Sequence, residues 1–230
     1  MQKKLPLFLI GIPIYEGVDL LDVTAPCEMF SWLKTSVAET MNVELRVVAR
    51  TSDPVTTRGG LRLVPDRTFA DTPRLDLLWV PGGDLIPLKR TMSDKAYLRF
   101  LQTRSRTATY VTSVCEGALL LASAGLLDGH RATTHWAFIP CLRRFPRIRV
   151  VAGYPRFVVN RIRRPKGKTR YVVTGGGISS GLDEALQLIK VIAGRKVAEG
   201  VQSSTQYFPQ PPVHGRIPPA TSCPLDSGTA

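Results

Sequence analysis

Hydrophobic residues recur along the chain in short continuous runs separated by segments with helical spacing. "LPLFLIGIPIY" near the N-terminus and "LDLLWVPGGD" after residue 74 contain the unbroken apolar runs of strands buried on both faces. "VELRVVAR" and "TATYVTSV" predict further strands, and "VDLLDVTAPCEMFSWL", "DKAYLRFLQTRS" and "GALLLASAGLL" predict helices. Because strands alternate with helices, we expect an α/β fold with a mostly parallel sheet covered on both faces.

Two hairpins and a long helix complete the predicted elements. "VTTRGGLRLVPD" predicts a hairpin that turns at Gly59-Gly60, and "RFVVNRI" and "TRYVVT" alternate like antiparallel strands around "RRPKGK". In "GGGISSGLDEALQLIKVIAG", Ser180 and Asp183 have the spacing of a helix N-cap and its partner. Pro26 predicts a kink in the first helix, or a place in its early turn.

The domain organisation follows from where these elements stop. We expect one domain over residues 1–207. From Phe208 the chain is rich in Pro, Ser and Gly, and we expect a tail, 208–230, that is poorly ordered or draped over the surface.

Composition excludes several classes of protein. The chain has 230 residues, 43% of them hydrophobic, yet no apolar stretch reaches the ~18 residues of a membrane span. The apolar run after the first two lysines contains two prolines and lacks a small-residue cleavage site, which favours a buried strand over a signal peptide. Cys27, Cys115, Cys141 and Cys223 show no CxxC spacing. We therefore expect no disulfide, no metal site, and a cytoplasmic protein with reduced thiols.

The net charge of +13 comes mostly from one segment. No acidic residue lies between Asp128 and Asp183, and this segment contains twelve basic ones. They are Arg131, Arg143, Arg144, Arg147, Arg149, Arg156, Arg161, Arg163, Arg164, Lys166, Lys168 and Arg170. The hairpin over 156–174 is either a solvated, extended turn or a patch that binds anions or nucleic acid. No recognition helix or aromatic platform accompanies it, so we expect no specific nucleic-acid partner.

A thiol stands between a predicted strand and a predicted helix. In "YVTSVCEGALLL", Cys115 and Glu116 follow a β-branched run, and Gly117 precedes the helix. A nucleophile on such a turn lies at the carboxyl edge of a parallel sheet, where ligands bind. The start of the helix favours a lowered thiol pKa. The alternative is that Cys115 is a buried cysteine that only packs in the core.

Two other segments reach the same edge of the sheet. Gly82 and Gly83 end the strand in "WVPGGD", and the amides of Gly83 and Glu116 would serve as an oxyanion hole for Cys115. Asp22 follows the first strand, where a nearby thiolate would favour its protonated form and an acid or base role. The alternative for the glycine pair is an ordinary tight turn at the end of the strand. The alternative for Asp22 is a helix-capping or surface acid.

The chain contains, in this order, "GVDLLDVTAP", "LLWVPGGD", "VTSVCEGALLLASAGLLDGHRATTHW" and "VVTGGGISSGLDEALQLI". Together these motifs resemble the ThiJ/PfpI superfamily, whose sheet is like that of class I glutamine amidotransferases, and within it the isonitrile hydratases. The resemblance covers residues 6–212. It implies a flavodoxin-like fold, a homodimer, Cys115 as nucleophile, Asp22 as acid, and a glycine pair that includes Gly83. His135 in "ATTHW" matches a histidine near the cysteine of many relatives; its alternative is a structural histidine bonded to backbone.

One position departs from this resemblance. Isonitrile hydratases usually have threonine after the cysteine, whereas this chain has Glu116. Glu116 either positions or deprotonates water in a second step, or points away and pairs with a basic residue.

The resemblance implies cysteine-dependent hydration of an isonitrile to an N-substituted formamide, with no metal or organic cofactor. One alternative is a non-catalytic ligand-binding protein, since the same domain is the sensor of AraC-type regulators. The chain ends about twenty residues after "QYFPQPP", so we expect no helix-turn-helix domain here. A hydrolase or amidase that acts on another small electrophile is the third possibility.

Overall fold

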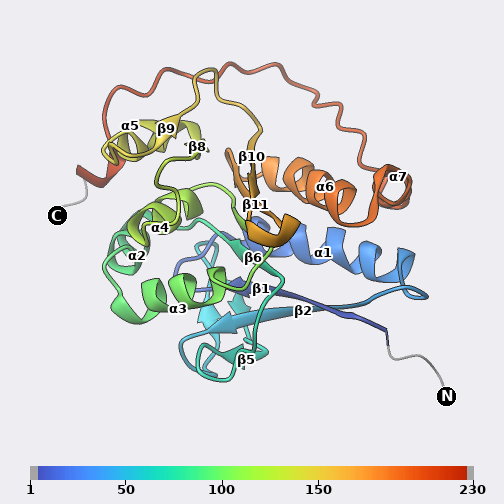
Figure 1. Ribbon diagram of the computed structural model, residues 1–230. Helices are drawn as coiled ribbons and strands as arrows, with labels where there is room; N and C mark the ends of the chain where they lie inside the picture. The colour runs from blue at the N-terminus through green and yellow to red at the C-terminus, as the bar shows by residue number, and fades with distance from the viewer. Residues whose placement is uncertain (1–4, 227–230) are drawn as a thin grey trace.

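A mostly parallel sheet forms the centre of the molecule (Figure 1). The computed structural model describes residues 5–226, and within them the main sheet has seven strands in the order β10-β11-β7-β6-β1-β2-β5. Neighbouring strands are parallel except β10 and β11, which are antiparallel. The strands are β1 (Leu7–Pro13), β2 (Asn42–Ala49), β5 (Arg67–Thr68), β6 (Leu77–Val80), β7 (Tyr110–Ser113), β10 (Phe157–Arg163) and β11 (Thr169–Gly175). The predicted α/β, flavodoxin-like fold is confirmed.

Helices cover both faces of this sheet. The helices are α1 (Leu20–Ser36), α2 (Leu85–Thr91), α3 (Lys95–Ser105), α4 (Gly117–Ser123), α5 (Ile139–Leu142), α6 (Ser180–Ala193) and α7 (Arg195–Ser204). In Figure 1, α1, α6 and α7 lie together on one side, and α2, α3 and α4 lie on the other. All four residues of β6 are inaccessible to solvent, as its unbroken apolar run predicts. No helix in residues 5–226 is long and apolar enough to cross a membrane.

Both predicted hairpins are present. β3 (Val55–Thr56) and β4 (Arg62–Leu63) pair around Gly59-Gly60, and β10 pairs with β11 from Phe157–Gly175 to Arg163–Thr169. A further short pair joins β8 (Arg131–Ala132) to β9 (Arg149–Val150).

Ser180 and Pro26, two residues used to predict helix starts and kinks, both lie within helices. The predicted N-cap of α6 is wrong by one residue, because Ser180 is the first helical residue and Ser179 is the N-cap. The Ser179 hydroxyl accepts a hydrogen bond from Arg156 and makes no capping bond. Pro26 lies inside the first half of α1, where it is buried.

The C-terminal tail crosses the surface, and a disulfide and polar contacts near its end attach it to the rest of the domain. Cys223 forms a disulfide with Cys141 in α5, with 4.8 Å between the Cα atoms. Asp226 pairs with Arg144, and the Lys89 ammonium donates to the Leu225 carbonyl at 3.2 Å. The prediction that no disulfide forms is therefore wrong, because a separation of 82 residues leaves no local spacing to recognise. The predicted domain and tail also include residues 1–4 and 227–230, which lie outside the described residues.

Candidate active site

Cys115 occupies a strained turn between β7 and α4. Its φ is 55°, a left-handed conformation that is rare for a residue other than glycine. The Cys115 N–H donates to the Gly176 carbonyl at 2.8 Å, and the Thr134 hydroxyl donates to the Cys115 carbonyl at 2.8 Å. Gly117 permits the turn, since a Cβ there would clash with the Val80 carbonyl. The predicted elbow geometry is present, and these bonds hold it.

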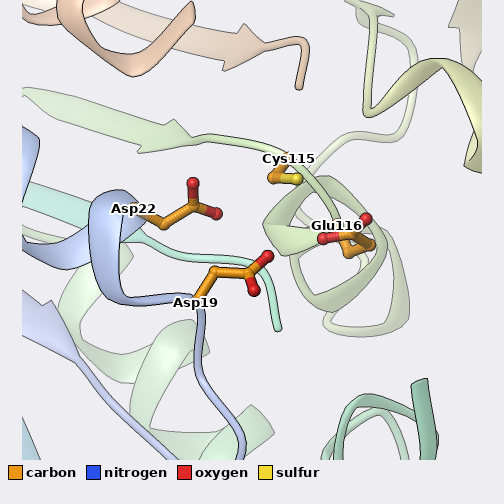
Figure 2. A group of neighbouring side chains, drawn as sticks. All are labelled: Asp19, Asp22, Cys115 and Glu116. Atoms are coloured by element: carbon orange, nitrogen blue, oxygen red, sulfur yellow. The ribbon is translucent and has the colours of Figure 1, made fainter. Parts of the chain in front are cut away.

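Three carboxyl groups surround the thiol of Cys115 (Figure 2). Asp19 and Asp22 come from the start of α1, and Glu116 follows the thiol on the elbow. One ligating atom from each of the four side chains lies within 4.8 Å of all the others, and all four residues are buried. We call this set, Asp19, Asp22, Cys115 and Glu116, the acid cluster.

The glycine pair fixes Asp22 and leaves room for the acid cluster. The Gly82 N–H donates to Asp22 Oδ2 at 2.8 Å. Asp22 Oδ1 has no hydrogen-bond partner among the described residues, although Asp22 is wholly buried. A Cβ at Gly82 would lie 2.9 Å from the Cys115 Cβ and would clash with Glu116 Oε2. Gly82 therefore has to be glycine for Asp22, Cys115 and Glu116 to meet.

Burial dominates the electrostatics of the acid cluster. It raises the pKa of Asp22 well above its ordinary value, and the nearby Glu116 carboxylate adds to this. Burial raises the pKa of the Cys115 thiol well above its ordinary value, with Asp22 and Glu116 adding to the effect. The predicted lowering of the thiol pKa is therefore wrong, because burial and negative charge outweigh the start of a seven-residue helix. The resting thiol keeps its proton.

Glu116 faces the thiol. Burial raises its pKa to about 7, while the Cys115 thiol and the backbone N–H groups of Glu116 and Gly83 hydrogen-bond to the carboxylate and limit the rise. The two amides expected to form an oxyanion hole thus point toward the Glu116 carboxylate. Of the two alternatives from the sequence, the side chain does not turn outward to a basic residue.

His135 bonds to the backbone, as its structural alternative predicts, and it also lies near Glu116. Its Nδ1 accepts the Ala137 N–H at 3.3 Å, which caps the short 3₁₀ helix Trp136–Phe138. The same Nδ1 lies 3.9 Å from Glu116 Oε1. Burial lowers the pKa of His135, and the charge of Arg58 lowers it further, so the ring is neutral near neutral pH.

Sequence reasoning missed Asp19 and Arg58. Arg58 Nη1 lies 3.5 Å from Asp19 Oδ1, at the edge of the acid cluster. Asp19 stands three residues before Asp22, but an acid at a helix N-cap has a plain structural explanation. The Asp19 side chain makes no capping bond and turns toward the cluster instead. No signal in the sequence identified Arg58, which reaches the site only because the β3–β4 hairpin folds back.

A cavity of about 420 Å³ lies next to the elbow at Thr134, His135 and Gly176, and no member of the acid cluster lines it. Its apolar lining includes Leu21, Trp136, Ile178 and, from the tail, Ile217. It also includes Thr134 and Gly176, the two residues that bond the Cys115 backbone. A second cavity, of about 440 Å³, lies at Tyr15, and the acid cluster does not line this one either.

Comparison with known proteins places the chain in a family. Residues 9–160 match the DJ-1/PfpI family. The chain belongs to the DJ-1/PfpI family. It is 38% identical over 213 residues to isonitrile hydratase of Pseudomonas putida, across 91% of this chain and 82% of that relative. The crystal structure of a ThiJ/PfpI family protein from Pseudomonas syringae superposes with a TM-score of 0.77 at 33% identity, covering 91% of this chain and 78% of that one. The predicted resemblance is confirmed.

Relatives in the same family include regulators. The chain is 28% identical over 149 residues to the HTH-type transcriptional regulator GbdR of Pseudomonas aeruginosa. That alignment covers 64% of this chain and 37% of the regulator. The comparisons therefore include both an enzyme and DNA-binding regulators with additional sequence.

Proposed function

We propose that the protein hydrates isonitriles to N-substituted formamides, with Cys115 as nucleophile and Asp22 as acid. One observation carries the proposal: the wholly buried Asp22 carboxyl stands beside the elbow thiol with one oxygen free of hydrogen-bond partners in the described chain. The similarity to isonitrile hydratase over 91% of the chain supports the choice of reaction.

The first step adds the thiol to the terminal carbon of R–N≡C. Asp22 gives its proton to that carbon while the sulfur of Cys115 attacks it, and the thiol proton replaces the one that Asp22 lost. A C–H and a C–S bond form, and the product is a thioimidate, R–N=CH–S–Cys115. Covalent catalysis thus divides one difficult addition into two easier ones.

The second step replaces sulfur by water. Glu116 accepts a proton from water while the water oxygen attacks the thioimidate carbon and the nitrogen takes up a proton from Asp22. The C–S bond then breaks, and the leaving sulfur recovers a proton from Glu116. A second proton, from the added hydroxyl, returns to Asp22, which leaves R–NH–CHO. The sum is R–NC plus one water, and every protein group returns to its starting state.

The cavity at Ile217 suits the substituent of such a substrate. Leu21, Trp136, Ile178 and Ile217 give it an apolar lining from separate segments of the chain. An isonitrile has a polar reacting carbon and a substituent that benefits from burial in such a lining. We infer that this cavity holds R while the carbon reaches Cys115.

An assay of formamide formation tests the function. Purified protein is incubated with isonitriles that carry methyl, cyclohexyl and benzyl groups, and the N-formamide is measured by chromatography. We expect turnover by the native protein and by Cys27→Ala, and none by Cys115→Ala. Cys27 is the other free cysteine in the described chain, so Cys27→Ala is the matched control. Equal turnover by native protein and Cys115→Ala would refute the proposal.

A second candidate function is non-catalytic ligand binding. The similarity to GbdR and the protonated, buried state of Cys115 favour it. It predicts saturable binding of an isonitrile or formamide in calorimetry without any conversion by the native protein. The homodimer implied by the family and the cytoplasmic location both stay predictions, and a disulfide such as Cys141–Cys223 is more usual outside reducing compartments.

A further inference from the structure

The acid cluster contains more acidic groups than the neighbouring basic side chains can neutralise. Asp19, Asp22, Cys115 and Glu116 each offer one atom to a volume less than 5 Å across. In the described chain, Arg58 is the one Lys or Arg that forms an ion pair with the cluster, and it contacts Asp19 alone. His135 is near Glu116, but its Nδ1 already accepts the Ala137 N–H. Buried carboxylates need a cation or protons to offset their charge.

A second observation points to a ligand inside the cluster. Asp22 Oδ1 is buried and has no partner within residues 5–226, and Glu116 Oε2 is in the same situation. In Figure 2, the Asp22 and Asp19 carboxyls point toward the Cys115 sulfur and Glu116. A buried carboxylate oxygen without a partner is costly unless something binds it.

The spacing and donor types fit a small divalent cation. Zinc binds cysteine sulfur at about 2.3 Å and carboxylate oxygen at about 2.0–2.2 Å, so tetrahedral donors lie roughly 3.5 Å apart. The donors of the cluster lie within 4.8 Å of one another, so small shifts of the side chains would be enough to reach that spacing. One sulfur and three oxygens favour zinc, cobalt or cadmium over magnesium and calcium, which prefer oxygen ligands alone.

We propose that the acid cluster binds one divalent, thiophilic metal ion through Cys115, Asp19, Asp22 and Glu116. One of these ligands departs from the isonitrile hydratases, because Glu116 stands where those enzymes usually have threonine. Binding is independent of the proposed reaction. If that reaction occurs, a bound ion inhibits it, because the ion takes up the thiolate.

Titration with Co²⁺ tests the proposal without any substrate. The full-length protein, freed of metal by a chelator and kept without thiol reductants, is titrated with Co²⁺ and followed by absorption. We expect saturation at one ion per chain, with sulfur-to-cobalt charge-transfer absorption in the near ultraviolet. Zn²⁺ added afterwards should displace the cobalt and remove the absorption.

Four variants assign the ligands. Cys115→Ser should lose the charge-transfer absorption, while Cys27→Ser should keep it unchanged. Asp22→Asn and Glu116→Gln should each weaken Co²⁺ binding at least about 10-fold. Near-ultraviolet circular dichroism checks that each variant is folded.

Three results would overturn the metal site. They are the absence of saturable absorption in the native protein, absorption that survives in folded Cys115→Ser, and unchanged Co²⁺ affinity in both carboxyl variants. The native titration decides alone if the variants do not fold. Because no isonitrile is present, failure here leaves the proposed hydratase untouched, and failure of the hydratase assay leaves this test untouched.

Discussion

The acid cluster and the basic hairpin formed by β10 and β11 carry charge in opposite ways. Asp19, Asp22 and Glu116 are buried side by side, where water cannot solvate them. Arg161, Arg163 and Lys168 are exposed along the hairpin, where water solvates each one. The hairpin carries six basic residues of a chain with net charge +13, yet the cluster holds the perturbed groups. A few buried ionisable groups with perturbed pKa values therefore indicate a functional site better than many solvated surface charges do.

Removing the transferable proton of Asp22 should have the largest effect on turnover. Asp22→Asn keeps the shape of the side chain but has no proton to give the isonitrile carbon. We expect formamide production to fall about 10²–10⁴-fold in steady-state kinetics. Asp53→Asn, at an exposed aspartate, is the matched control and should change nothing. Near-normal turnover by a folded Asp22→Asn variant would disprove the acid role.

Glu184 is a buried carboxyl outside the acid cluster, and it tests whether burial alone raises a carboxyl pKa in this protein. It is wholly buried on α6, accepts a hydrogen bond from the Thr112 hydroxyl, and its pKa is raised well above 4.5 by burial. The unfolded chain releases this proton above about pH 4.5, whereas the folded chain holds it, so stability falls as pH rises toward the folded pKa. Each pH unit in that window removes about 1.4 kcal/mol.

Glu184→Gln keeps the hydrogen-bond acceptor and removes the titration. We expect it to be more stable than the native protein at about pH 8 and to lose that advantage at about pH 4, measured by urea unfolding. Glu199→Gln, at an exposed residue of α7, is the control and should differ by less than about 0.5 kcal/mol. A stability difference that does not vary with pH would show that Glu184 does not titrate as described.

The tail offers a smaller effect, on specificity. Ile217 lines the cavity next to the elbow, so Ile217→Ala should raise KM for cyclohexyl isonitrile about 10-fold and leave KM for methyl isonitrile unchanged. Val213→Ala is the control, because both residues are exposed in the same tail but Val213 does not line the cavity. Equal changes for the two substrates would argue against a wall formed by the tail.

The basic hairpin should show the smallest effect. Replacing Arg161, Arg163 and Lys168 with serine leaves the site intact, so turnover should stay within error of the native value. DNA retention in a mobility-shift assay should occur only at low salt, without sequence preference, and should disappear near physiological ionic strength. Salt-resistant, sequence-selective binding would contradict this and favour the regulator interpretation.

Local patterns predicted the fold and the elbow. The apolar run of β6 and the Cys-x-Gly turn at Cys115 are set by neighbouring residues, so periodicity and turn chemistry identified them. The predicted direction of the shift in the thiol pKa was wrong because the thiol is buried and Asp22, from a distant segment, lies close to it. Asp19 and Arg58 were missed because each joins the site through contacts between distant segments.

The disulfide between Cys141 and Cys223 turns the C-terminal third of the protein into a covalent ring. The ring spans 82 residues and encloses β10, β11, α6 and α7, so one edge of the sheet and two of its covering helices unfold under a constraint that the N-terminal half lacks. Chain entropy assigns such a closure about 4.5 kcal/mol. A reductant thus lowers the free energy of unfolding by releasing a constraint that lies entirely outside β1, β2, β6 and β7.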